Sequence, residues 1–241
     1  MTVTFAQLGK YGRLGNQLWQ IAATIGYSHR HGCDYALPQW EYASQFNIPA
    51  ESFRPFKSKN SYNEPYFHYA GIPFKPDTNL HGYFQSYKYW HDCEGKIRRL
   101  LTPKRYQEKL LDTTAIHVRR TDYLTHKGCY EILGMNYYER AMAQMNTSKY
   151  LIFSDDISWC KKHFIGNQFE FSEGNSDVVD LSIMIKCINN IIANSSFSWW
   201  GAWLNPNPDK VVIAPKNWFG PKLASTHDTK DLLPSEWLKI D

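Results

Sequence analysis

A chain of 241 residues is long enough for two small domains, and 43% apolar and 21% charged residues are typical of a folded globular protein. The net charge of +4 suits an anionic small-molecule ligand, but the basic residues form no dense run of the kind that binds nucleic acid. We therefore expect no nucleic-acid partner.

The five cysteines and the first residues bear on the cellular compartment. The number of cysteines is odd, their spacings are wide and no C-x-x-C pair occurs, which favours reduced thiols over disulfides or a zinc cluster. The N-terminus lacks the basic and apolar regions of a signal peptide, and no apolar run has the length of a membrane span. These features predict a cytoplasmic protein without a membrane span.

The first half of the chain shows one clear pattern. An apolar run over residues 3–8 leads into a glycine-punctuated turn over 9–15. Asn16 to His31 then has the apolar spacing of a helix, which Gly32 is expected to end. Residues 38–80 show little periodicity and are expected to be irregular with short strands, whereas 89–111 are expected to be helical.

The second half alternates between strand and helix patterns with short loops. Strands are predicted over 114–118, 150–153, 169–171, 190–193 and 210–214, and helices over 137–145, 158–164, 177–187 and 198–204. This alternation predicts an α/β fold with a doubly wound parallel sheet. Such sheets bind ligands at the C-terminal ends of their strands, so the residues that follow the strands are the candidate site.

The first of these strands ends in His117-Val118-Arg119-Arg120-Thr121-Asp122. Because side chains alternate along a strand, His117 and Arg119 are expected on one face and Arg120 on the other. A guanidinium group binds phosphate with two hydrogen bonds and stays charged at all usable pH values. Arg119 is therefore a candidate diphosphate ligand, and the alternative is a structural arginine paired with Asp122.

The next strand ends in two adjacent carboxylates, Asp155 and Asp156. They could bind a divalent metal, cap the following helix, or accept hydrogen bonds from a guanine base. A later strand leads into Asn194-Ser195-Ser196-Phe197-Ser198, whose small residues precede a short helix. The free N–H groups of a helix N-terminus can bind phosphate, and the alternative is an ordinary serine cap.

Five segments, in this order, resemble the motif series of the α-1,2-fucosyltransferases, which form glycosyltransferase family 11. The resemblance spans nearly the whole chain, and the wider group includes the α-1,6- and protein O-fucosyltransferases, which share the arginine motif. The segments are Gly12 to Gln20, His81 to Ser86, His117 to Asp122, Phe153 to Asp156 and Ile192 to Asn205.

The resemblance implies a GT-B-like α/β fold with two Rossmann-like domains that face a cleft. The expected domains are a short, irregular acceptor-side domain over 1–110 and a GDP-fucose-binding domain over 111–241. The implied reaction is inverting transfer of L-fucose from GDP-β-L-fucose to the 2-hydroxyl of a terminal galactose on an oligosaccharide acceptor, without a metal or cofactor. The alternatives are another linkage, a protein acceptor, or a nucleotide-sugar-binding protein without catalysis.

The resemblance also assigns roles to individual residues, although it names no catalytic base. Arg119 would contact the diphosphate, His117 the nucleoside side, and Asp156 the guanine. Asn16 would face fucose and the acceptor, and it is paired with Arg119 as a catalytic residue. The remaining donor-side residues are Gly15, Ser196, Phe197 and Ser198, and the supporting residues are Arg120, Asp122 and Asp155.

Overall fold

The computed structural model describes residues 1–104 and 110–241, which divide into two compact units. Unit 1 comprises Met1–Lys104 together with His227–Pro234, and unit 2 comprises 110–226 together with Ser235–Asp241. The sequence predicted a single division after residue 110. In the structure, residues 227–234 also belong to the first unit.

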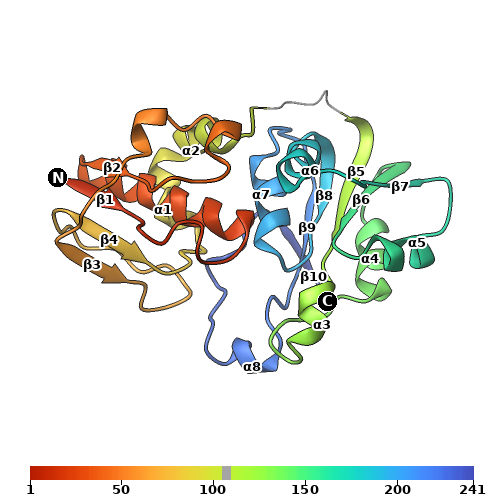
Figure 1. Ribbon diagram of the computed structural model, residues 1–241. Helices are drawn as coiled ribbons and strands as arrows, with labels where there is room; N and C mark the ends of the chain where they lie inside the picture. Colours follow the sequence, from red (N-terminus) through yellow and green to blue (C-terminus); the bar gives the residue numbers. More distant parts are fainter. Residues whose placement is uncertain (105–109) are drawn as a thin grey trace. The chain divides into compact units, whose positions relative to one another are not determined.

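Unit 1 is built on a four-stranded sheet in the order β2-β1-β4-β3, in which all strand pairs are parallel. The helix α1 packs on β1 and β2, with α2 beside it (Figure 1). The strands are β1 (Thr2–Thr4), β2 (Asp34–Ala36), β3 (Asn60–Asn63) and β4 (Thr78–His81). The helices are α1 (Leu14–His31) and α2 (Glu94–Leu101), with 3-10 turns η1 (Ala43–Gln45), η2 (Ala50–Ser52), η3 (Tyr87–Tyr89) and η4 (His91–Cys93).

The helix α1 confirms the clearest expectation for this half. It begins two residues before Asn16 and ends at His31, and Gly32 follows in the left-handed conformation with φ of 59°. There the Gly32 N–H donates to the carbonyls of His29 and Ser28, which gives carbonyl groups of the last helical turn a hydrogen-bond donor.

Two expectations for unit 1 were wrong in extent. The first strand stops at Thr4, because residues 5–8 turn into the glycine loop. The helix expected over 89–111 is represented by η4 and α2, and Leu110 already belongs to a strand of unit 2. The part of that helix over 105–109 lies outside the described residues.

Unit 2 is a doubly wound α/β structure, as predicted. Its sheet has the order β10-β9-β8-β5-β6-β7, and every strand pair in it is parallel. The strands are β5 (Leu110–Val118), β6 (Lys149–Ser154), β7 (Phe169–Phe171), β8 (Cys187–Ile191), β9 (Val212–Pro215) and β10 (Leu238–Ile240). The helices are α3 (Thr121–Thr125), α4 (Met135–Met142), α5 (Ile157–His163), α6 (Asp177–Met184), α7 (Ser196–Leu204) and α8 (Pro221–Ala224).

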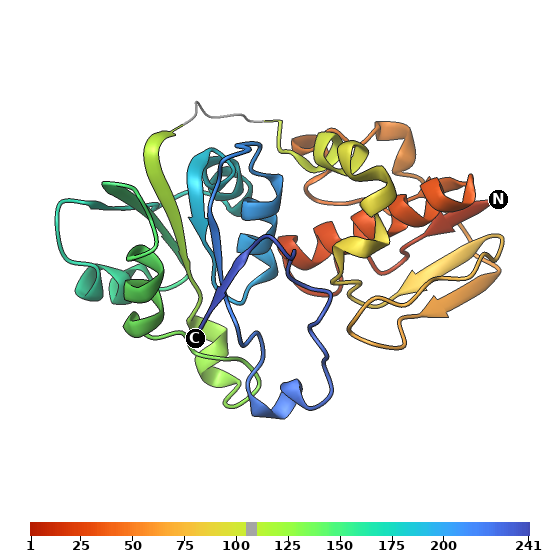
Figure 2. The same cartoon turned by 180° about the vertical axis from the view of Figure 1, so that it is seen from behind.

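Helices cover both faces of this sheet, with α4 and α5 on one side and α6 and α7 on the other (Figure 2). Successive residues of β5 pack alternately on the two faces of the sheet. Ile116 and Val118 join the core beneath α4 and α5, whereas Ala115 joins a second core with Met184 of α6. The alternation fixes the direction in which the residues after β5 leave the sheet.

The strands and helices expected in unit 2 are all present, with shifted ends. The largest shift is at β5, which starts four residues before the predicted 114. The strand β8 starts three residues before the predicted 190 and takes Cys187 from the predicted helix. The short elements α3, α8 and β10 were not expected.

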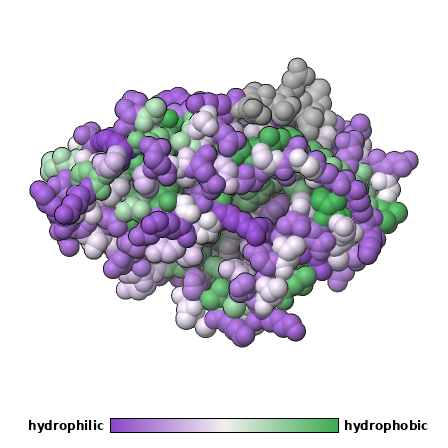
Figure 3. All heavy atoms as spheres, viewed as in Figure 1, coloured by the Kyte–Doolittle hydropathy of each residue, from purple (hydrophilic) through white to green (hydrophobic). Residues whose placement is uncertain are grey.

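The surface agrees with the globular composition. On the face in Figure 3, hydrophilic residues predominate and apolar residues form small separate groups. All five cysteines are free, and three of them are buried. Within the described parts of the chain, no helix combines the length and apolar character that crossing a membrane requires.

Candidate functional site

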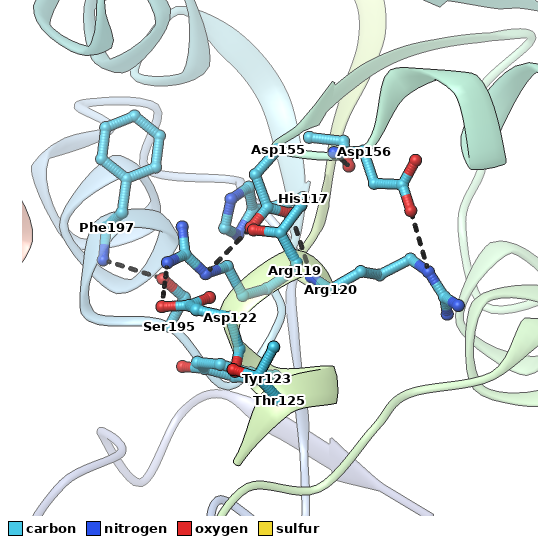
Figure 4. A network of polar contacts seen from close by, with 12 residues as sticks. His117, Arg119, Arg120, Asp122, Tyr123, Thr125, Asp155, Asp156, Ser195 and Phe197 are labelled. Carbon is cyan, nitrogen blue, oxygen red and sulfur yellow. Dashed lines mark hydrogen bonds and ion pairs between the residues drawn. The ribbon is translucent and has the colours of Figure 1, made fainter.

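The candidate site of unit 2 lies where β5, β6 and β8 end at the same edge of the sheet (Figure 4). The pairing of β5 with β6 matches Val118 to Ser154, so the residues that follow these two strands are neighbours. The chain after β8 leads into α7, whose first residues meet the end of β5 through His117. The sequence motifs of three separate segments are therefore brought together.

Arg119 lies in the middle of this cluster and is largely buried, with its side chain 13% exposed. Its Nη2 donates to Oδ2 of Asp122 at 2.7 Å, and its Nε lies 3.3 Å from Oδ2 of Asp155. The guanidinium also lies 5.5 Å from the ring centroid of Tyr123. Burial works to lower the pKa of Arg119, but the hydrogen bond to Asp122 and the charge of Asp155 outweigh it and raise the pKa.

This arrangement holds the Arg119 guanidinium on two sides. Within the described chain, Nη1 has no hydrogen-bond partner. The expected alternative, a pairing with Asp122, is thus present and still leaves one edge of the guanidinium for a ligand. Two carboxylates fix the orientation of that edge in advance.

Arg120 points the other way, as the strand alternation predicts (Figure 4). Its guanidinium lies 4.0 Å from the ring centroid of Trp159, and its Nε lies 3.5 Å from Oδ2 of Asp156. Trp159 belongs to α5, so Arg120 ties the end of β5 to the start of the helix after β6. A cation over a tryptophan face stabilises such a contact by about 0.5–2 kcal/mol.

Asp155 organises the end of β5. Its Oδ1 accepts from the backbone N–H of Arg120 at 2.9 Å, and its Oδ2 accepts from the Thr121 hydroxyl. Together with the ion pair to Arg119, these contacts occupy both carboxylate oxygens. Asp155 thus supports the arginine motif.

Asp156 is the N-cap of α5. Its Oδ1 accepts from the backbone N–H of Trp159 at 3.0 Å, while Oδ2 faces Arg120. The capping alternative raised by the sequence is therefore realised. The Asp156 side chain is still 28% exposed, so it remains partly accessible.

His117 and Ser198 form a buried pair. The Nδ1 atom of His117 lies 2.9 Å from the Ser198 hydroxyl, and the two residues are 5% and 0% exposed. Burial, and then the positive charge of Arg119, lowers the pKa of His117 to about 3, so the imidazole is neutral near physiological pH. Ser198 thus contacts His117 instead of opening onto solvent, and Nε2 is the ring nitrogen left for a ligand.

The start of α7 is capped by Ser195, whose hydroxyl accepts weakly from the Phe197 N–H at 3.4 Å. Ser196 and Phe197 are half-buried at this end of the helix. The backbone N–H of Ser196 has no partner among residues 1–104 and 110–241. It is therefore available to an anion, as helix N-termini commonly are.

Asn16 and Gly15 lie in the first turn of α1 and belong to unit 1, whereas the donor-side cluster belongs to unit 2. The Oδ1 atom of Asn16 accepts from Nε2 of Gln85 at 2.9 Å. Gln17 and Gln20 donate to the carbonyls of Gly12 and Tyr11, which holds the glycine loop against the helix. The two motifs of this half thus meet at Asn16.

Three contributors were missed by sequence reasoning. Trp159 carries the Arg120 stack, Tyr123 lies beside Arg119, and Gln85 orients Asn16. Gln85 could have been found from the sequence, because it belongs to the motif His81 to Ser86. The two aromatic residues gave no signal, since their partners come from other elements of the fold.

The described residues around the arginine motif form no cluster suited to a metal ion. Among the described residues, no group of three His, Cys, Asp or Glu side chains is placed to hold a metal ion. A cavity of about 420 Å³ at the ends of β9 and β10 is lined by Arg140, Lys216 and other residues, none of which is a predicted donor ligand. The absence of a metal requirement stays a prediction.

Comparison with known proteins places this geometry in a family. The model of glycosyl transferase family 11 matches residues 28–241. The alpha-1,2-colitosyltransferase of Escherichia coli is 30% identical over 205 residues, which cover 76% of this chain and 70% of that protein. The O-antigen biosynthesis glycosyltransferase WbnK of Escherichia coli is 40% identical over 119 residues, but these cover only 45% of this chain and 39% of WbnK.

A solved structure supports the fold. The NodZ alpha-1,6-fucosyltransferase soaked with GDP-fucose aligns with a TM-score of 0.53 and 14% identity, covering 85% of this chain and 92% of the NodZ chain. At this identity the likeness bears on fold alone, and it confirms the expected GT-B-like α/β architecture. The family model and the colitosyltransferase relative, aligned over 70% of its length, show that the chain belongs to glycosyltransferase family 11.

Proposed function

We propose that the chain is an inverting, metal-independent transferase that moves L-fucose from GDP-β-L-fucose to the 2-hydroxyl of a terminal galactose. The observation that carries the proposal is the state of Arg119. Its guanidinium is held by Asp122 and Asp155, and Nη1 is left without a partner in the described chain. A fixed cation with one free edge is suited to a diphosphate.

The chemistry explains why this cation matters. As the bond to the sugar breaks, positive charge develops on the sugar and negative charge on the β-phosphate. A cation whose position is fixed beforehand stabilises this charge more in the transition state than in the ground state. The unpartnered Ser196 N–H at the start of α7 would add a second donor to the phosphates.

The nucleoside is assigned to His117 and Asp156. The neutral His117 ring keeps Nε2 for a hydroxyl or base edge, since Nδ1 faces Ser198. The partly accessible Asp156 side chain can accept from the ring N–H and amine of guanine, which uracil does not offer. Phe197, half-buried with its ring centroid 5.5 Å from that of His117, offers an apolar surface beside them.

The acceptor is assigned to unit 1. Tyr11, Tyr66 and Tyr83 follow the strands β1, β3 and β4, whose C-terminal ends share one edge of the sheet. Their exposed fractions are 39%, 59% and 44%. Exposed tyrosine rings provide an apolar face with a polar tip, which suits a sugar ring.

A second donor is favoured by one observation. The relative with 30% identity over 70% of its length carries the name alpha-1,2-colitosyltransferase. A colitosyl donor is therefore the alternative substrate, with the same diphosphate and linkage chemistry.

Donor hydrolysis and transfer across GDP-fucose, GDP-colitose, GDP-mannose and UDP-galactose would test the proposal. We expect turnover of GDP-fucose to exceed that of the others, with a lactose-type acceptor increasing product formation. A preference for GDP-colitose would select the alternative donor. Tight GDP binding without turnover of any donor would instead indicate a binding protein and overturn the proposal.

A further inference from the structure

Glu64 follows directly after β3, at the edge of the unit 1 sheet where the strands end. Its backbone N–H donates to the carbonyl of His81, the last residue of β4, at 2.7 Å. Its Oε2 atom accepts from the backbone N–H of Tyr83 at 2.7 Å and from that of Phe84 at 3.0 Å. One carboxyl oxygen therefore holds two consecutive peptide groups of the segment Gly82–Gln85, here called the Gly82–Gln85 turn.

The conformation of this turn depends on such support. Gly82 has φ of +149°, and a Cβ at this position would lie 2.4 Å from Cβ of Glu64, so the turn closes directly onto Glu64. Phe84 has φ of 52°, which is unfavourable for a residue other than glycine. The Phe84 side chain is fully buried, so the residue cannot relax by turning outward.

The turn ends at Gln85, which connects it to the first turn of α1. Gln85 is 8% exposed, and its Nε2 donates to Oδ1 of Asn16 at 2.9 Å. A continuous series of contacts thus runs from the Glu64 carboxyl group, through the peptide groups of the turn, to the amide of Asn16. Asn16 is the residue that the resemblance places toward fucose and the acceptor.

We propose that Glu64 is a positioning residue for transfer: its ionised carboxylate fixes the Gly82–Gln85 turn, and through Gln85 it orients Asn16. The inference rests on the proposed function, because it concerns the role of Asn16 in that reaction. Glu64 acts only through the turn and touches no substrate. Hydrogen bonds to an ionised acceptor are stronger than those to a neutral one, so loss of the charge loosens the turn.

The environment of Glu64 lets this charge change near neutral pH. Burial raises the pKa of Glu64 to about 7, although the two N–H donors work to lower it. The Oε1 atom is buried and has no hydrogen-bond partner in the described chain. Tyr62 and Tyr89 are the other groups coupled to it; burial and then the Glu64 charge raise the pKa of both, so they stay neutral.

His81, the last residue of β4, also lies at this edge of the sheet. The direction of the pH effect follows from the raised pKa of Glu64. Below pH 7 the carboxyl group becomes neutral and the turn is held less tightly, whereas above pH 7 it is ionised and the turn is fixed. A variant that keeps His81 but cannot ionise at position 64 isolates the effect of the Glu64 charge.

Glu64→Gln is that variant, because glutamine keeps an acceptor oxygen and the shape of the side chain. We expect its kcat for transfer to match wild type at pH 5.5 and to be about tenfold or more lower at pH 8.5, the scale of a slightly misplaced group. The KM for GDP-fucose should be equal in both proteins. Glu51→Gln, an exposed residue of unit 1, should follow wild type at both pH values. A ratio that does not change with pH would overturn the proposal.

The amide resonances of Tyr83 and Phe84 provide a readout without substrate. Their proton shifts should titrate with a midpoint near pH 7 in wild type and in Glu51→Gln, and should be flat in Glu64→Gln. Flat wild-type resonances, or a titration that persists in Glu64→Gln and so belongs to another group, would overturn the proposal. If these amide shifts titrate but the protein transfers sugar from none of the donors, the contact of Glu64 with the turn stands. The proposed function, and with it the role of Glu64 in transfer, is then wrong.

Discussion

The side chains of Arg119 and Arg120 leave the end of β5 in opposite directions (Figure 4). That of Arg119 reaches Asp122 at 2.7 Å, in the cluster with His117 and the start of α7. That of Arg120 lies 4.0 Å from the ring centroid of Trp159 in α5. Two adjacent residues of one type therefore have separate surroundings, Arg119 among Asp122 and Asp155 and Arg120 against α5.

Replacing Arg119 by lysine should keep the fold but lower kcat about a hundredfold or more, the scale of losing one preorganised donor. Lysine carries the charge but cannot contact two carboxylates and a phosphate at fixed angles. Arg120→Lys should retain most turnover, because lysine keeps a cation beside Asp156 and residue 120 faces away from the guanidinium edge proposed for the diphosphate. The measurement is kcat at saturating GDP-fucose, with circular dichroism to verify folding. Turnover of Arg119→Lys within a few-fold of wild type would show that the arginine is structural.

Replacing Asp156 by asparagine separates its two roles. Asparagine is as good an N-cap as aspartate, so α5 should remain stable, whereas alanine should lose about 1 kcal/mol. Both variants should lose the preference for GDP over UDP, because neither presents a carboxylate to guanine. Calorimetric titration with both nucleotides measures this preference, and thermal unfolding measures the cap. Equal affinity of the wild type for GDP and UDP would remove the guanine assignment.

Removal of metal ions should leave turnover unchanged. Asp155 already accepts from the Arg120 N–H and from the Thr121 hydroxyl, and Asp156 is used by Trp159 and Arg120. A divalent ion at this pair would have to replace these contacts. Activity assayed in EDTA, and again after addition of Mn²⁺ or Mg²⁺, tests this expectation. Activity lost in EDTA and restored by either ion would contradict it.

The buried His117 should make stability depend on pH. Its pKa is lowered from 6.5 to about 3, so between these values the unfolded chain binds the proton more strongly than the folded chain. Stability is therefore highest above pH 6.5 and falls as the pH decreases, by about 2 kcal/mol between pH 7 and pH 5. His117→Gln lacks this pH-dependent contribution. The difference in free energy of unfolding between wild type and His117→Gln, measured by urea unfolding, should therefore decrease by that amount from pH 7 to pH 5.

The exposed His29 provides the control for this measurement, because His29→Gln should keep the wild-type pH dependence. Parallel pH profiles for wild type and His117→Gln would mean that the imidazole is not buried in its neutral form.

The fold was predictable where local patterns were strong. The helix α1 has an apolar face and a terminal Gly32, and the β5 to β9 region alternates regularly, so both were located to within a few residues. The short strand β10 has only three residues, of which two are exposed, and it pairs with β9. Nothing in three such residues distinguishes a strand from a loop.

The candidate site was predictable to a similar extent. The strand-end rule and the motif series located Arg119, His117 and Asp156. They could not show that Ser198 is wholly buried against His117, because burial depends on how α7 packs. Glu64 gave no signal at all, since it lies in a segment without periodicity and its partners are backbone groups some twenty residues away.

The return of His227–Pro234 to unit 1 affects how the protein can be divided. In that segment Asp231 accepts from the backbone N–H of Tyr69 at 3.2 Å and forms an ion pair with Lys88. A recombinant fragment that ends near residue 110 would lack Asp231 and would leave both partners without it. The two halves of this sequence therefore cannot simply be produced as two separate proteins, and a version of unit 1 made alone would need residues 227–234 attached by a new peptide linker.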